Sequence, residues 1–118
     1  MSFETLSLRK EILDALTDLG YHTPTEVQSQ VIPPALAGKN MIVQSHTGSG
    51  KTAAFVIPAL NGIDSRLRSP QVLILEPTRE LAVQTREEVY NESKYMRMSS
   101  IALFGGSPIW KQREGLRA

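Results

Sequence analysis

The first twenty residues repeat apolar side chains every three or four positions. Leucine or isoleucine occupies positions 6, 8, 12, 13, 16 and 19. This spacing places them on one face of a helix. Ser7 is a residue type that caps helix N-termini, and Gly20 stands where a C-terminal stop is expected. The pattern therefore predicts a helix over residues 7–19.

A second helix is predicted to begin at Thr25. Thr25 and Gln28 have the spacing of a reciprocal capping box, in which each side chain bonds the other residue's backbone N–H. An apolar stripe follows at Val27, Val31, Ile32 and Leu36. Pro33 and Pro34 lie inside this stripe, so we expect them to kink or restart the helix.

Three short apolar runs alternate with helical stretches in the rest of the chain. The runs cover residues 41–43, 72–75 and 100–104, and helical patterns follow residue 50 and residue 79. Strands that alternate with helices are typical of a parallel sheet covered by helices on both faces. The predicted fold class is therefore α/β, with one domain in 118 residues. Residues 111–118 have the pattern of a helix with no closing strand after it, so we expect an incomplete domain.

Composition narrows the possible chemistry. The chain has no cysteine and two histidines, which excludes disulfides and thiolate metal sites. Its formal charge of +1 gives no evidence for nucleic acid. The sequence shows neither a basic and apolar leader nor a membrane-length apolar segment, so we expect no membrane partner. A cytoplasmic protein is expected, or a nuclear one in a eukaryote.

Residues 45–52, with the sequence SHTGSGKT, predict a phosphate-binding loop between a strand and a helix. Gly48 and Gly50 allow a tight turn whose amides face phosphate oxygens. Lys51 would reach the β- and γ-phosphates, and the Thr52 hydroxyl would bind Mg²⁺. These two residues are the candidate catalytic residues, and Thr52 is the candidate metal ligand. Ser45 occupies a position where the strict pattern has glycine, but the strand before and the helix after favour a nucleotide site over a chance turn.

Three more segments resemble motifs of the DEAD-box RNA helicases. Residues 20–28, GYHTPTEVQ, are similar to that family's Q motif, and residues 77–82, PTRELA, to its motif Ia. Gly105 and Gly106 resemble its GG element, and Phe3 lies upstream of the Q motif as in the family. The motifs occur in the family's order around the phosphate loop. The resemblance implies the N-terminal part of a RecA-like P-loop domain, the first of two in an ATP-dependent RNA helicase.

The resemblance implies two sets of site residues. Gln28 would bond the adenine edge and Phe3 would stack on the ring, which selects ATP over GTP. The implied ATP-binding residues are Phe3, Tyr21, Thr23, Gln28, Ser45, His46, Thr47, Gly48, Ser49, Gly50, Lys51 and Thr52. Those implied to contact the RNA backbone, without sequence specificity, are Pro77, Thr78, Arg79, Gly105 and Gly106.

Taken without the resemblance, several of these residues have simpler interpretations. Gln28 would be a capping residue, Phe3 an apolar plug and Thr78 a helix N-cap. Glu76 stands where the family has a small or apolar residue before the motif Ia proline, and we expect it to face solvent. Trp110 is expected to pack rather than to stack on a base.

Three functions remain open. The family's Asp-Glu-Ala-Asp tetrad is absent from the 118 residues, as is the second domain. The first hypothesis is an ATP-driven RNA helicase of which this chain supplies the ATP site and part of the RNA site. The second is an isolated adenine-nucleotide-binding module without turnover. In either case we expect a monomer. Another P-loop ATPase would explain Lys51 and Thr52 but not Phe3, Gln28 and the PTRELA segment.

Overall fold

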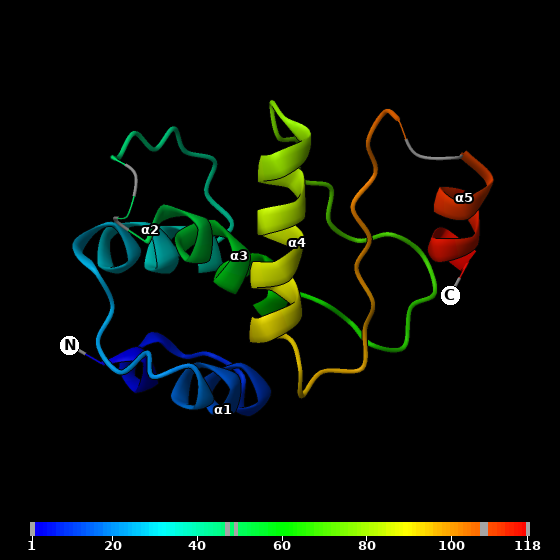
Figure 1. Cartoon of the computed structure of the whole chain (residues 1–118). Coiled ribbons are helices and arrows are strands. Elements are labelled where there is room, and N and C mark those ends of the chain that lie inside the picture. The colour runs from blue at the N-terminus through cyan, green and yellow to red at the C-terminus, as the bar shows by residue number, and fades with distance from the viewer. Residues whose placement is uncertain (1, 47, 49, 107–108, 118) are drawn as a thin grey trace.

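The computed structural model describes residues 2–46, 48, 50–106 and 109–117. For residue 117 it describes the backbone alone. Figure 1 shows α1 beneath α2 and α3, with α4 standing beside them and α5 apart, beyond two long extended segments. No helix in the described ranges is both long and apolar enough to cross a bilayer. The elements are a 3₁₀ helix η1 (Phe3–Leu6) and the helices α1 (Lys10–Asp18), α2 (Glu26–Leu36), α3 (Lys51–Asn61), α4 (Arg79–Glu92) and α5 (Ile109–Arg117).

The first helix begins later than predicted. Ser7 is not its cap but has a left-handed backbone, with φ 62° and ψ 38°, and α1 begins at Lys10. The backbone N–H of Arg9 donates to Asn61 Oδ1 at 2.8 Å, and its guanidinium donates to the Ile63 carbonyl at 2.6 Å. These two contacts hold Arg9 extended against the end of α3, which outweighs the local preference for an earlier start.

The start of α2 is as predicted. Thr25 and Gln28 form the reciprocal capping box, with both side chain-to-backbone bonds present. The predicted restart at the prolines is wrong, because α2 is a single helix from Glu26 to Leu36 and contains both Pro33 and Pro34. Their fixed φ angles are compatible with a helix, although each proline removes one backbone hydrogen bond and crowds the carbonyl four residues before it. The predicted kink stays a prediction.

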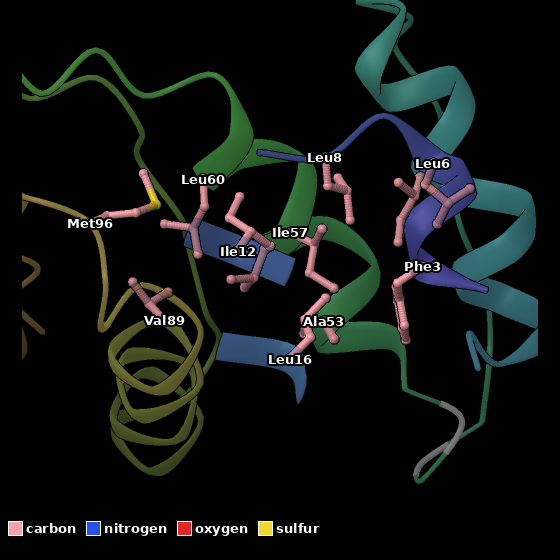
Figure 2. Packing of buried hydrophobic residues seen from close by; sticks show 12 residues of the cluster. Phe3, Leu6, Leu8, Ile12, Leu16, Ala53, Ile57, Leu60, Val89 and Met96 are labelled. Carbon is pink, nitrogen blue, oxygen red and sulfur yellow. The ribbon is translucent and has the colours of Figure 1, made fainter. Parts of the chain in front are cut away.

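A hydrophobic core forms around α3. This helix packs along α2 and contacts α1 and α4. Figure 2 shows side chains from η1, α1, α3 and α4 meeting in one cluster. The side chains of Ile12, Ile32 and Ile57 are fully buried. The cluster consists of Phe3, Leu6, Leu8, Ile12, Leu16, Ile32, Ala53, Val56, Ile57, Leu60, Val89 and Met96.

The predicted parallel sheet is not formed within the described residues. Residues 41–43, 72–75 and 100–104 form neither helix nor strand. Ile42 is 101% exposed, Leu73 82% and Leu75 83%. A strand of a two-sided sheet needs a neighbour for its backbone groups and cover for both faces. Among the described residues, these runs have no paired neighbour, and only some of their side chains, such as Ile74, pack against the core. Much of the apolar pattern that predicted strands is therefore exposed.

One acidic side chain lies inside the helical core. Thr85, Val89 and Glu92 form the buried face of α4, and Glu92 is fully buried. Within the described part of the chain, neither of its carboxyl oxygens has a hydrogen-bond partner. Burial raises the pKa of Glu92 to about 10, and the neighbouring carboxyl of Glu88 adds to the shift. Glu92 is therefore protonated at neutral pH.

The buried carboxyl makes stability depend on pH. Unfolded Glu92 has a pKa near 4.5 and folded Glu92 one near 10, so unfolding releases a proton between these values. The Glu92 contribution to the free energy of unfolding should be complete below pH 4.5 and should be lost progressively as pH rises from there toward 10, by at most about 1.4 kcal/mol per pH unit. Glu92→Gln should therefore become more stable relative to the wild type as pH rises from 6 to 9 in urea titrations. Glu87→Gln, an exposed change on the same helix, is the control, and parallel curves for Glu92→Gln and the wild type would contradict the prediction.

Candidate nucleotide and nucleic-acid site

The phosphate loop closes onto its own lysine. Gly48 and Gly50 both have φ +86°, a left-handed conformation that favours glycine. Gly50 is the N-cap of α3, which begins at Lys51. The Lys51 ammonium donates to the Ser45 carbonyl across the loop at 3.2 Å. Lys51 is exposed, so its charge is available to an anion that enters the loop.

Gln28 connects the start of α2 to the phosphate loop. Its side chain is buried, with 4% exposure. Its Nε2 donates to the Gly50 carbonyl at 3.2 Å, and its Oε1 accepts from the Thr25 N–H at 2.9 Å. The capping box therefore aims one end of the amide at the residue before α3. Sequence analysis placed Gln28 near a nucleotide base but did not predict this direct bond to the loop.

The remaining predicted nucleotide-binding residues differ in how far they are buried. Phe3 is 3% exposed and packs within the core cluster, so its ring faces are covered. In this conformation it fits the simpler interpretation of an apolar plug, and stacking on adenine stays a prediction. Tyr21, Thr23 and His46 are exposed. Burial of part of the Tyr21 ring raises the pKa of its hydroxyl.

Thr52 lies in the first turn of α3 and is half-buried. Its position directly after Lys51 suits a hydroxyl ligand beside a phosphate-binding lysine. No cluster of three histidine or carboxylate side chains that could hold a metal occurs among the residues described. Thr47 and Ser49 lie outside the described residues.

The predicted nucleic-acid residues converge at the start of α4. Thr78 is the N-cap of α4, and its Oγ1 accepts from the Leu81 N–H at 3.2 Å. The Arg79 guanidinium lies over the Phe104 ring, 4.5 Å from its centroid. A Cβ atom added to Gly106 would lie 3.9 Å from an Arg79 nitrogen. Tertiary structure therefore brings PTRELA and the glycine pair together, and both Pro77 and Gly105 are exposed beside them.

Phe104 is the residue at this site that sequence analysis missed. It was assigned only to a predicted strand, although an aromatic residue directly before two glycines can present its ring face to a partner. Its backbone is fixed to α5, because Gln112 accepts from the Phe104 N–H at 3.1 Å and donates to its carbonyl at 3.0 Å.

Comparison with known proteins identifies the family. The family model described as DEAD/DEAH box helicase matches residues 25–118, which is most of the chain. The chain belongs to the DEAD/DEAH box helicase family. Among relatives of this family, the chain is 50% identical over 117 residues to the ATP-dependent RNA helicase DeaD of Klebsiella pneumoniae. It is 46% identical over 115 residues to the ATP-dependent RNA helicase DbpA of Bacillus subtilis.

Solved DEAD-box structures have a similar backbone. The chain aligns with a DEAD box protein from the hyperthermophile Methanococcus jannaschii with a TM-score of 0.85 and 35% identity, over 98% of this chain and 32% of that one. It aligns with the RNA-helicase Prp28 from Chaetomium thermophilum bound to ADP with a TM-score of 0.86 and 34% identity, over 98% and 30%. The alignments with DeaD and DbpA each cover 98% of this chain, but only 18% of DeaD and 24% of DbpA. It therefore corresponds to a limited part of these DEAD-box proteins.

The contact between Gln28 and Gly50 predicts different tolerance at two loop glycines. Alanine at Gly48 or Gly50 should cost about 1 kcal/mol of backbone strain, because both are left-handed. A Cβ at Gly50 would also lie 2.5 Å from Gln28 Nε2, whereas no described atom lies within 4 Å of one at Gly48. Gly50→Ala should thus lower the free energy of unfolding by about 1–2 kcal/mol more than Gly48→Ala in urea titrations without nucleotide. Equal losses would show that the contact does not restrict the loop.

Proposed function

We propose that this chain supplies the ATP-binding site and part of the RNA-binding surface of a DEAD-box ATP-dependent RNA helicase. The observation that carries the proposal is the direct bond between Gln28 and the Gly50 carbonyl, which joins the Q-motif segment to the phosphate loop. A solitary glycine turn would need no such partner. Family membership and ATP-dependent RNA helicase relatives support the same function.

ATP would bind by exchanging contacts that the protein makes with itself. The Lys51 ammonium would leave the Ser45 carbonyl for the β- and γ-phosphates, while the amides at the start of α3 bond phosphate oxygens. The Gln28 amide would exchange Thr25 and Gly50 for the adenine edge, because one amide can donate and accept at once. Nucleotide binding would therefore release the loop from α2.

Mg²⁺ fits this site as a companion of the nucleotide. Thr52 offers one hydroxyl, and the phosphates would supply further oxygen ligands, which suits an ion that is held by few protein groups. When bound, the ion neutralises charge on the phosphates. Thr52 would then fix the position of the phosphates relative to Lys51.

RNA would bind at the start of α4. Thr78, Arg79 and Gly106 lie together there, and backbone N–H groups at a helix N-terminus suit a phosphodiester. Contacts of this kind hold the backbone without reading bases. Yeast Dbp5, solved bound to RNA and ADP BeF3, aligns with this chain at a TM-score of 0.79 and 38% identity, over 81% of this chain and 25% of that one. We extend RNA binding to this chain on that likeness.

Completion of the fold and of catalysis would require sequence beyond these 118 residues. We propose that the extended runs at residues 41–43, 72–75 and 100–104 become strands of a parallel sheet when further strands pair with them. The carboxylates that orient the attacking water would come from the same additional sequence. The absence of the Asp-Glu-Ala-Asp tetrad from the 118 residues favours a nucleotide-binding module without turnover as the second candidate for the chain alone.

Turnover in the intact protein that carries these residues tests the nucleotide site. Lys51→Ala should reduce RNA-stimulated phosphate release from ATP by about 100-fold or more, because it removes charge stabilisation from the transferred phosphoryl group. Gln28→Ala should remove the preference for ATP over GTP in the same assay. Full activity of Lys51→Ala would contradict the phosphate role. An unchanged ATP preference in Gln28→Ala would contradict the adenine role.

RNA affinity tests the second site. Arg79→Ala should weaken binding of labelled single-stranded RNA by about tenfold, since it removes one phosphate contact, and it should reduce the salt slope by about one. Arg79→Lys should bind with intermediate affinity, because an ammonium cannot reproduce the planar stack on Phe104. Arg86→Ala, an exposed arginine on the same helix, is the control. A similar loss of nucleotide affinity in Arg79→Ala would indicate a structural role instead.

A further inference from the structure

Glu76 does not face solvent as the sequence led us to expect. It is half-buried, and its Oε1 accepts from the Thr85 hydroxyl at 2.7 Å. Thr85 lies on the buried face of α4, with 7% exposure. The bond therefore joins the end of an extended segment to the second turn of the helix that follows it.

The bond spans the segment that carries the proposed RNA contacts. Pro77, Thr78 and Arg79 lie between Glu76 and the body of α4. Within this segment, Thr78 is the N-cap of α4 and accepts a hydrogen bond from the Leu81 N–H. Two side-chain hydrogen bonds thus hold the backbone on both sides of Pro77, and this backbone sets the position from which Arg79 reaches Phe104.

A negative charge at Glu76 would be unfavourable for RNA binding nearby. A carboxylate near a phosphodiester lowers affinity by repulsion. The hydrogen bond to Thr85 turns Oε1 toward the buried face of α4. The hydrogen bond to Thr85 therefore indicates a structural role for this carboxylate, whereas its charge alone would only weaken RNA binding.

We propose that Glu76 is a positioning residue for RNA binding, which acts by bonding Thr85 and so fixing the approach of residues 77–79 to the start of α4. The inference rests on the proposed RNA-binding function. It adds a pair of residues, Glu76 and Thr85, that need not touch the RNA themselves.

Four substitutions in the intact protein separate the hydrogen bond from the charge. Glu76→Ala and Thr85→Val each remove the bond, and each should weaken binding of labelled single-stranded oligouridylate by about three- to tenfold. Glu76→Gln keeps an acceptor oxygen and Thr85→Ser keeps the hydroxyl, so both should bind within about twofold of the wild type. The double variant Glu76→Ala with Thr85→Val should bind no more weakly than either single one, because both remove the same contact.

Two further readouts exclude a merely structural effect. Thr85→Val removes one buried hydrogen bond and should lower the thermal midpoint slightly. Its affinity for fluorescent ADP should match that of the wild type, because the proposed nucleotide site lies at the start of α3. In an Arg79→Ala background, Glu76→Ala should have a smaller effect on RNA affinity than in the wild type, since the proposal has Glu76 act partly through the position of Arg79.

The outcomes distinguish the two proposals. Stronger RNA binding by both Glu76→Ala and Glu76→Gln, with no effect of Thr85→Val, would overturn positioning and leave repulsion as the role of Glu76. Weaker binding by Arg79→Ala together with unchanged binding by Glu76→Ala and Thr85→Val would overturn positioning alone. Unchanged RNA binding by Arg79→Ala would overturn the proposed RNA site, and the positioning role with it.

Discussion

The α3 helix buries five side chains, and this requirement determines how the helical part of the chain is arranged. Val56, Ile57 and Leu60 are each at most 4% exposed, and each such side chain contributes about 1.5–3 kcal/mol when it leaves water. Three other helices supply much of the cover: α2 packs along α3, while α1 and α4 contact it and each other. Because α3 begins at Lys51, directly after the glycine loop, the packing that holds the core also fixes where the phosphate-binding end of the loop lies.

Both candidate sites lie at helix N-termini whose backbone has been fixed by short side-chain bonds. The Thr25–Gln28 capping box sets the Gln28 amide, and this amide reaches the residue before α3. At the second site, the Thr78 cap and the Glu76–Thr85 bond hold the start of α4 in a comparable way. Free N–H groups and a positive dipole end make such positions suited to anions. In the proposed function, the phosphates of a nucleotide at the first site and of RNA at the second would present the same chemistry.

The helical core and the extended runs differ in how well they are covered. Helices satisfy their own backbone groups, so four of them can form a core from 118 residues. The apolar runs cannot do so without neighbouring strands, and several of their side chains, such as Ile42, Leu73 and Leu75, stay exposed. Glu92 shows that the core is not optimised for stability alone, since a carboxyl with raised pKa occupies a fully buried position on α4. An apolar side chain of similar size would pack there without that cost.

The sequence by itself determined the features that depend on local chemistry. The capping box at Thr25 and Gln28, the glycine conformations that the loop needs and the start of α4 at Arg79 follow from residue type and spacing, because each involves contacts within a few residues. Tertiary structure decided the rest. Arg9 held by Asn61 moved the start of α1, the core enclosed Phe3, and the three predicted strands do not pair within the described residues. Gln28 bonds to Gly50, 22 positions away, and the Arg79 guanidinium lies over the ring of Phe104, 25 positions away. A local sequence pattern cannot predict such contacts, because they depend on how distant segments pack.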